Sequence, residues 1–451
     1  MNYKLRIGLL LFCLCPMLLF GQTALSALGN MHSVVKGETW ESVAAIYGVS
    51  VAELQAANPD VSSKKKLKKR TLLIIPKRNE QVAKDNQQEP SAINSQLVAQ
   101  APLIRTKLTD MKVGVLLSFS DQKMVEFYRG FLMAADSVRK SGVNLDIHAW
   151  DCSTTKLQIE SLLPKLSEMD VIIGPSFANQ VSAVAEVCRE RGIRLILPFS
   201  TSLMLQDYPL VYNATASNGV VYSTAVEKLM SYYRDRNFVF IRSGNPDSRG
   251  KLLSEKLVQE LTKQSVPYRF LELEGDGFAY ESAFNQFRDN MVLLDDSSIR
   301  SLNILLARLK EFRQKHPEYR LSLMGYAEWQ DETQRLLSDF FSYDTYIISP
   351  YYYNVLDDRT KRFQRIYEKF FRTPIAQGNP RLAALGFDIG LYFLSGISSL
   401  GDTFEQMQGG LRQEPYQNWF QFERSTTGMS FTNRFVQFIH FTPDSKIELI
   451  R

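Results

Sequence analysis

Hydroxyl and other polar side chains follow the ends of several apolar segments, and together they could bind a small anion. The candidate ligand contacts are Ser118, Ser120, Ser176, Ser200, Thr201, Asn245, Asp247, Tyr326 and Tyr351. The carboxyl ends of parallel strands meet at one edge of a sheet, which is where ligands bind in such folds. Backbone N–H groups at the starts of the following helices would favour a carboxylate. The alternative is that these hydroxyls only cap helices, as Ser and Thr commonly do.

Histidines are few and scattered, which argues against a metal site or an acid–base enzyme. The chain has His32, His148, His316 and His440, and no two of them stand at metal-ligand spacing. It also lacks the sequence signatures of zinc proteases, serine hydrolases, dithiol oxidoreductases and phosphate-binding loops. We therefore expect no enzymatic activity, no metal and no cofactor. A glycoside hydrolase, which requires only two well-placed carboxylates, is a minor alternative.

Apolar segments alternate with amphipathic ones from residue 112 onward, which predicts strands separated by helices. The expected strands are 112–117, 144–150, 171–173, 194–197, 238–241, 268–273, 291–294, 320–324 and 346–348. The expected helices include 125–139, 157–166, 181–191 and 251–262. Continuous apolar strands between helices are typical of a parallel sheet covered on both faces. The pattern restarts near residue 238, so the sequence predicts an α/β fold with two doubly wound lobes around a cleft.

The order of motifs in this region resembles that of type I periplasmic binding proteins, in particular the receptors for branched-chain amino acids. The similar segments are KVGVLLSFS (112–120), VIIGPSFANQVSAVAEVCRERGIRLILPFSTS (171–202), GNPDSRG (244–250) and LAALGFDIGLYFLSG (382–396). The resemblance implies a ligand in the cleft, with a carboxylate-binding hydroxyl at Ser200 or Thr201. Gly386-Phe387-Asp388 stands where the family has Gly-Tyr-Asp. We expect Asp388 to be a helix or packing element rather than a ligand contact.

One position departs from the amino-acid receptors of that family. They usually carry Ser or Thr four residues after the glycine of the third-strand turn, and here Ala178 follows Gly174 at that spacing. Ser176 could substitute for the missing hydroxyl with a different geometry. The departure weakens the expectation of a free amino acid as ligand.

Residues 32–76 form a separate small block. A short strand at 32–35 is followed by a helix from Trp40, a second helix begun by a Ser50/Glu53 capping box, and a closing strand at 72–75. This order resembles the LysM module, a βααβ unit that binds N-acetylglucosamine chains such as those of peptidoglycan. The glycan contacts that the resemblance implies are Gly37, Glu38, Thr39, Asn58 and Pro59.

The small block is also the basic part of the chain. Residues 31–78 hold nine Lys and Arg against four Asp and Glu, a surplus as large as the +5 of the whole chain. In the turn at 67–70, the usual Leu-Lys-x-Gly reads Leu-Lys-Lys-Arg, without the glycine. A basic cluster can bind nucleic acid, but we expect no nucleic acid partner for an exported protein. A solvated turn, or attraction to anionic wall polymer, explains the cluster better.

The N-terminus has the features of a secretory signal peptide. Lys4 and Arg6 precede an apolar stretch at 7–20 that is too short for a membrane span. No small residue precedes Cys13 or Cys15, so we expect no lipid anchor. We also expect no later segment to be apolar enough to span a bilayer. The predicted parts are a signal peptide (1–21), a LysM module (31–77), a flexible linker (78–109) and a type I binding-protein-like domain (110–451). The expected location is the periplasm, in association with the wall.

Cys152 and Cys188 are the cysteines that would remain after cleavage. An exported pair can form a disulfide, and two buried thiols are the alternative. The sequence leaves both open.

Two functions remain in competition. In the first, the LysM module binds peptidoglycan while the two-lobed domain binds a small solute, such as an amino acid or a wall-derived peptide. In the second, the binding fold has lost its small ligand and acts as a scaffold or regulator of a cell-wall synthesis enzyme or another envelope protein. Ala178 slightly favours the second. A solute should raise the melting temperature of a receptor, whereas a scaffold should co-purify with its protein partner.

Overall fold

The computed structural model describes residues 31–34, 39–47, 49–59, 61, 67, 71–75, 107–153, 156–199, 208–424 and 430–451. The chain divides into two compact units, residues 1–102 and residues 103–451. The predicted signal peptide, and almost all of the predicted linker, lie outside the described residues.

The first unit has the predicted βααβ order. Its elements are β1 (Met31–Ser33), α2 (Trp40–Tyr47), α3 (Val51–Ala56) and β2 (Leu72–Ile74), and β1 pairs antiparallel with β2. The core contains Trp40, Val43, Leu54 and Leu73. The predicted capping box is confirmed, because the Ser50 hydroxyl accepts from the Glu53 N–H while the Glu53 carboxylate accepts from the Ser50 N–H.

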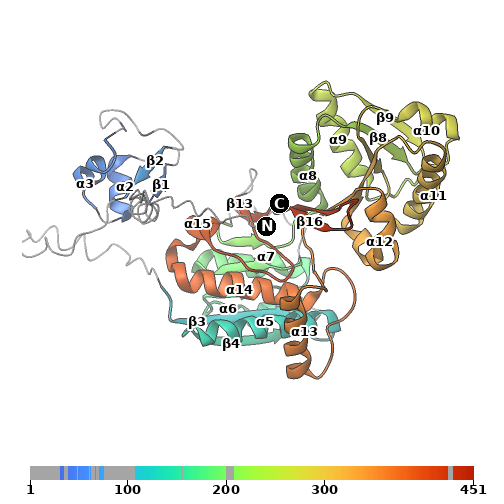
Figure 1. Ribbon diagram of the computed structural model, residues 1–451. Coiled ribbons are helices and arrows are strands. Elements are labelled where there is room, and N and C mark those ends of the chain that lie inside the picture. The colour runs from blue at the N-terminus through green and yellow to red at the C-terminus, as the bar shows by residue number, and fades with distance from the viewer. Residues whose placement is uncertain are drawn as a thin grey trace, which may run out of the picture. The chain divides into compact units, whose positions relative to one another are not determined.

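The second unit contains two lobes, each built on a seven-stranded sheet (Figure 1). In lobe 1 the strand order is β13-β14-β7-β6-β5-β3-β4. The strands are β3 (Asp110–Leu117), β4 (Asn144–Asp151), β5 (Val171–Ile173), β6 (Arg194–Leu197), β7 (Val211–Asn213), β13 (Phe422–Arg424) and β14 (Phe431–Asn433). The helices are α5 (Gln122–Lys140), α6 (Lys156–Leu166), α7 (Ala178–Arg191), α13 (Asp358–Phe371), α14 (Leu382–Leu400) and α15 (Phe404–Met407), with 3₁₀ turns η2 (Gly401–Thr403) and η3 (Gln408–Gly410).

Lobe 2 repeats this plan with the strand order β16-β15-β12-β11-β10-β8-β9. The strands are β8 (Asn237–Arg242), β9 (Tyr268–Glu272), β10 (Asn290–Leu294), β11 (Leu321–Tyr326), β12 (Thr345–Ser349), β15 (Gln437–Phe441) and β16 (Ile447–Ile450). The helices are α8 (Asn218–Tyr232), α9 (Lys251–Lys263), α10 (Gly277–Ala283), α11 (Ile299–Lys315) and α12 (Thr333–Ser342), with the 3₁₀ turn η1 (Ala327–Glu332).

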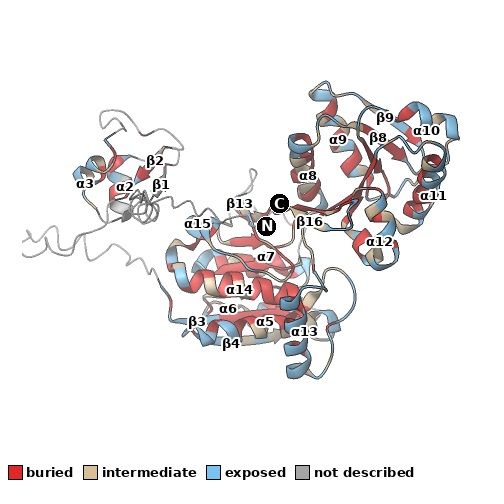
Figure 2. Cartoon of the chain, in the orientation of Figure 1, coloured by how far each residue is buried: buried red, intermediate tan, exposed pale blue. Residues whose placement is uncertain are grey.

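The central strands of both sheets are buried, the edge strands β4, β9, β13 and β16 are partly exposed, and exposed residues also lie on the outer faces of the helices (Figure 2). In lobe 1 two apolar clusters cover the two faces of the sheet. One contains residues of α5 and α14, including Phe131 and Phe393, and the other contains residues of α6 and α7, including Ile159 and Val184. Helices on both faces of a mainly parallel sheet are the predicted doubly wound arrangement. The predicted fold class is therefore confirmed.

Helices α5 and α14 pack side by side at unusually close range (Figure 1). A Cβ atom at Gly386 would lie 2.0 Å from the Phe127 carbonyl oxygen, and one at Gly130 would lie 1.9 Å from the Ala383 carbonyl oxygen. Each glycine therefore allows the backbone of one helix to contact the backbone of the other. The glycine of the Gly386-Phe387-Asp388 motif has a packing role.

The segment Leu382–Gly410, which begins with α14, is long and apolar enough to cross a membrane by composition, so the expectation that no later segment reaches this hydropathy is wrong. However, 78% of its apolar window is buried inside the protein, as in the core helix of a globular domain.

The strand positions follow the sequence closely, but the sheet edges do not. The nine predicted strands each overlap one of β3–β6 and β8–β12. Strand β13 pairs antiparallel with β14, β15 with β12, and β16 with β15. Strands β7 and β13–β16 were not predicted. Cys152 and Cys188 are free and buried. Burial raises the pKa of both thiols, that of Cys188 to about 12.

Candidate functional site

Three of the predicted hydroxyls meet at the carboxyl ends of β3 and β5 in lobe 1. The Ser118 N–H donates to the Ser176 hydroxyl oxygen at 3.2 Å, and the Ser118 and Ser120 hydroxyls are 3.0 Å apart. Ser118 is buried, Ser176 is half-buried and Ser120 is exposed. The cluster thus reaches from the interior of the lobe to its surface. Ser200 and Thr201, predicted at the end of the next strand, lie outside the described residues.

Helix α7 begins beside this cluster without a side-chain cap. Its N-cap residue is Phe177, which provides no hydrogen-bonding side chain. Gln180, in the first turn, donates its amide N–H to the Cys152 carbonyl at 2.9 Å. Its amide oxygen is buried and has no hydrogen-bond partner among the described residues. A helix start with uncapped N–H groups attracts anions. Gln180 was not among the residues predicted from the sequence. The feature that could have identified it is its position in the first turn of the helix that begins at Ala178.

Aromatic rings flank the serine cluster. Phe119, between Ser118 and Ser120, packs edge-on against Tyr128 with ring centroids 5.2 Å apart. Phe199, at the end of β6, packs edge-on against Phe127 at 5.0 Å. The strand ends of lobe 1 therefore combine hydroxyls with apolar surface.

The prediction for Tyr326 is wrong. This side chain is 1% exposed and its hydroxyl donates to the backbone carbonyls of Leu294 and Gly250. Burial raises its pKa well above the ordinary value. Tyr326 is part of the lobe 2 core, because the last residue of β11 still points its side chain between the strands and helix α9.

Asn245 and Asp247 lie in the loop that follows β8, as predicted. The Asn245 amide donates to Asp296 at 3.3 Å, and its oxygen accepts from the Asp247 N–H at 3.1 Å. Both ends of the amide thus hold the loop in shape. Asp247 is exposed and its carboxylate is turned to solvent.

Tyr351 follows β12 and lies close to acidic side chains. Burial raises its pKa, and the negative charges of Glu328 and Asp331 raise it further. Glu328 has the same effect on Tyr222 of α8, whose pKa is raised mainly by burial. Glu328 itself is exposed, and the described part of the chain gives its carboxylate no ion-pair partner. Glu328, two residues after the end of β11, was not among the residues predicted from the sequence.

The two lobes also touch near these acids. The Asn379 amide, in the loop before α14, donates to the Asp331 carboxylate at 3.0 Å. That loop is held to lobe 1 by Glu126, whose carboxylate accepts from the N–H groups of Ala376 and Ala383 at 3.3 Å.

Asp388 has the packing role that was expected. It is fully buried in α14, and its carboxylate accepts from the backbone N–H groups of Tyr416, Gln417 and Asn418 at 2.8, 2.9 and 2.8 Å. Burial raises its pKa to about 7, although these three hydrogen bonds lower it. Asp388 therefore fixes the segment that leads from α15 to β13.

In the first unit, Asn58 connects the end of α3 to β2. Its side chain donates to the carbonyls of Leu54 and Ile74 at 2.7 Å and accepts from the Ile74 N–H at 2.6 Å. The Asn58 side chain is 6% exposed, and all of these hydrogen bonds are to backbone groups of the same unit. It therefore stabilises the fold of this unit. Thr39 and Pro59 are exposed. Gly37 and Glu38 lie outside the described residues.

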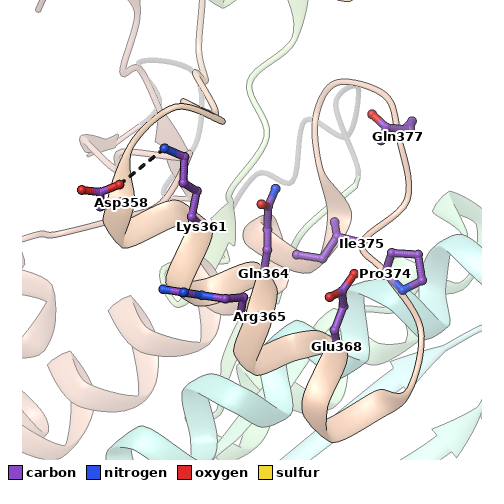
Figure 3. A pocket seen from close by; sticks show the side chains of 8 residues that line it. All are labelled: Asp358, Lys361, Gln364, Arg365, Glu368, Pro374, Ile375 and Gln377. Carbon is purple, nitrogen blue, oxygen red and sulfur yellow. Dashed lines mark hydrogen bonds and ion pairs between the residues drawn. The ribbon is translucent and has the colours of Figure 1, made fainter.

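A cavity of about 700 Å³ lies beside α13, outside all of the predicted site residues (Figure 3). Its charged lining residues are Asp358, Lys361, Arg365 and Glu368, and Lys361 is paired with Asp358 at 3.4 Å. Residues 374–377 form the opposite wall. The absence of buried polar groups in this lining makes it a solvated surface hollow. Across the described residues, no group of three or more His, Cys, Asp and Glu is arranged to hold a metal ion.

Residues 32–76 match the family model of the LysM domain. No curated protein matches the chain in sequence. Solved structures match over residues that make up about three quarters of it. A protein described as a branched-chain amino acid ABC transporter from Rhodospirillum rubrum is 11% identical, covers 76% of this chain and 100% of its own, and has a TM-score of 0.54.

An ABC transporter substrate-binding protein from Desulfitobacterium hafniense, solved with Leu, is 16% identical. The match covers 76% of this chain and 100% of that one, with a TM-score of 0.43. At these identities the likeness concerns the fold. The chain thus combines a LysM domain with the two-lobed fold of type I periplasmic binding proteins.

Proposed function

We propose that this protein is a non-enzymatic binding protein of the cell envelope. Its LysM domain binds N-acetylglucosamine chains of peptidoglycan, and its two lobes bind a small zwitterion, an amino acid or a wall-derived peptide. A solved structure of similar fold is described as a branched-chain amino acid ABC transporter. The proposal for this chain rests on its own side chains at the ends of the strands.

The single observation that carries the proposal is the opposite character of the two strand-end faces. On lobe 1, the uncapped start of α7 stands beside Ser118 and Ser176, an arrangement of donors suited to a carboxylate. On lobe 2, Glu328 offers an exposed carboxylate beside Tyr351, which suits an ammonium group. A zwitterion held between the lobes would satisfy both.

A thermal-shift screen of the full-length protein against amino acids, short wall peptides and muropeptides tests the solute. Binding at a concentration one hundred times Kd adds about 2.7 kcal/mol to the free energy of unfolding, which is a clear rise in Tm. Compounds that carry only one of the two charges should bind more weakly than the matching zwitterion. If no zwitterion raises the Tm, the proposal of a solute receptor is wrong.

The wall association is tested by co-sedimentation with purified peptidoglycan. We expect the full-length protein to sediment with the wall and to be released by soluble N-acetylglucosamine oligomers. Release by salt alone would instead assign the attraction to the basic residues within 64–70, because exposed charges are screened by salt. Protein that stays in the supernatant under all conditions would contradict the role of the LysM domain.

A second candidate function is the protein-binding scaffold, and two exposed rings on lobe 2 favour it. Phe278 on α10 and Phe287 in the turn after it are 79% and 86% exposed. Fully exposed phenylalanines are costly in water and are enriched where proteins meet. This function predicts that an envelope protein co-purifies with the wild type and is lost from the Phe278→Ser/Phe287→Ser variant, with no Tm response to solutes.

A further inference from the structure

A second cavity, which we call the hinge pocket, lies where chain segments pass between the lobes. It has a volume of about 390 Å³, within the range of small-molecule sites. Its walls come from residues after β12, from the segment before β13, and from the start of β15 and the end of β16. None of the predicted strand-end contacts lines it, so it is separate from the site described above.

One wall of the hinge pocket is a face of the β15–β16 pair. Phe438 is paired with Ile450, so Gln437 and Arg451 stand opposite each other one step further along the antiparallel ladder. Directly opposite residues project their side chains from the same face, with Cβ atoms about 5 Å apart. Leu449 lies on that face too, because alternate residues of a strand share a face. This wall therefore offers an amide, a guanidinium and an apolar side chain together.

Gln437 is the polar group of this wall that lacks a partner. The residue is 1% exposed, and its amide oxygen is buried with no hydrogen-bond partner in the described part of the chain. A buried amide oxygen without a donor costs about 1–3 kcal/mol, and Gln437 is one of the residues that line the cavity. A ligand N–H group that reached this oxygen would remove the cost.

Arg451 is the available positive charge. Its guanidinium lies over the Trp419 ring at 4.1 Å from the centroid, and within the described ranges it faces no carboxylate in an ion pair. The other charges of the lining are already engaged. Arg359 donates to the carbonyls of Pro415 and Glu414, Asp357 caps α13, and the Glu414 carboxylate pairs with Arg412.

We propose that the hinge pocket binds a small amide-bearing carboxylate, of the class of an N-acylated amino acid. Its carboxylate pairs with Arg451, its amide N–H donates to Gln437, and its apolar body lies against Leu449 and the rings of Tyr352 and Trp419. An N-acylated amino acid has no ammonium group for Glu328, so it is the wrong ligand for the strand-end site. The two sites are therefore chemically distinguishable.

Three matched compounds test the site by calorimetric titration of the full-length protein. N-acetyl-leucine carries both the amide and the carboxylate, N-acetyl-leucinamide lacks the carboxylate, and 4-methylpentanoate lacks the amide. We expect N-acetyl-leucine to bind at least tenfold more tightly than either control. Equal affinity of all three, or no binding of N-acetyl-leucine, would overturn the proposal.

Two substitutions locate the binding. Arg451→Gln should weaken N-acetyl-leucine at least tenfold, whereas Arg335→Gln, an exposed arginine of lobe 2, should have no effect. Gln437→Leu should abolish the preference for the amide and also raise the Tm, because it removes a buried oxygen without a donor. A fall in Tm would mean that the protein itself satisfies this amide. Binding that survives both pocket variants but is lost in Ser176→Ala would place the compound at the strand ends and refute the hinge pocket.

Discussion

The two lobes share a plan but use their strand ends differently. In lobe 1, the small residues Ser118, Ser120 and Ser176 converge at the surface beside an uncapped helix. In lobe 2, the tyrosine at the end of β11 turns inward to the core, and the exposed acid two residues later, Glu328, takes the surface position. A strand-end position thus predicts which residues are neighbours. It does not predict burial, because Tyr326 at the end of β11 is 1% exposed whereas Glu328 is exposed.

The largest effect on stability should come from a substitution that disrupts the packing of α5 against α14 in lobe 1. In Gly386→Ala the new Cβ would lie 2.0 Å from the Phe127 carbonyl oxygen, so α5 and α14 must separate. We expect a loss of about 3 kcal/mol or more in the free energy of unfolding, measured by denaturant titration. The matched change in lobe 2 is Gly277→Ala, where no atom lies within 4 Å of the new Cβ. An equal loss in both variants would contradict the close-packing role of Gly386.

A second comparison tests which strand-end side chains stabilise the core and which contact the proposed ligand. Tyr326→Phe leaves two buried carbonyls without their donor, so it should lower stability by about 1–3 kcal/mol and leave solute affinity unchanged. Ser176→Ala should do the reverse, with little change in Tm and about tenfold weaker binding. Thermal unfolding and titration with the best zwitterion measure both quantities. Loss of binding in Tyr326→Phe with normal stability would restore the tyrosine to the ligand site.

Two carboxylates, the buried Asp388 of lobe 1 and the half-buried Asp344 of lobe 2, should give opposite dependences of stability on pH. The pKa of Asp388, in lobe 1, is raised by burial to about 7, above the value of about 3.9 for an unfolded chain. Between about pH 3.9 and about pH 7, Asp388 is therefore protonated in the folded protein and ionised in the unfolded chain. The contribution of this group to stability falls as the pH rises through that window.

Asp344, in lobe 2, shows the opposite shift. Burial alone would raise its pKa, but hydrogen bonds from His440 and Ser322 and the charge of Arg236 hold it below the ordinary value. Its contribution is present above about pH 3.9 and is lost as the pH falls through its lowered pKa. The difference in unfolding free energy between wild type and Asp388→Asn should shrink from pH 4 to pH 7, and that for Asp344→Asn should grow as the pH rises from 2 to 4. Parallel slopes would show that one assignment is wrong.

The smallest effect concerns the contact between the lobes. The bond from Asn379 to Asp331 is exposed, so Asn379→Ala should change stability by less than about 1 kcal/mol. If this bond holds the lobes at a set angle, the variant should still alter the radius of gyration in small-angle scattering. An unchanged scattering profile would limit the bond to a local role.

Most of the frame could be predicted because the signals are local. Continuous apolar segments gave the positions of β3–β6 and β8–β12, and the Ser50/Glu53 pair gave the start of α3. Strands β13–β16 could not be found this way, because they are short, and β14 and β15 pair with β7 and β12, which lie much earlier in sequence.

The site was predictable only in part. Ser118 and Ser176 were predicted because each follows the end of a strand, and the structure brings them into contact although they are 58 residues apart in sequence. Glu328 was missed because one exposed glutamate among many has no distinguishing local pattern. Gln437 was missed for a different reason. Its unpaired amide oxygen is a property of the packed structure, which no sequence pattern reports.

The measurement that tests the central claim most directly is the Tm response to zwitterions in three proteins: wild type, Tyr326→Phe and the Ser176→Ala/Glu328→Gln double variant. The account predicts that an amino acid or a wall peptide raises the Tm of the first two by the same amount and leaves the Tm of the double variant unchanged. A response of equal size in the double variant, or none in the wild type, would contradict complementary strand-end faces as the ligand site.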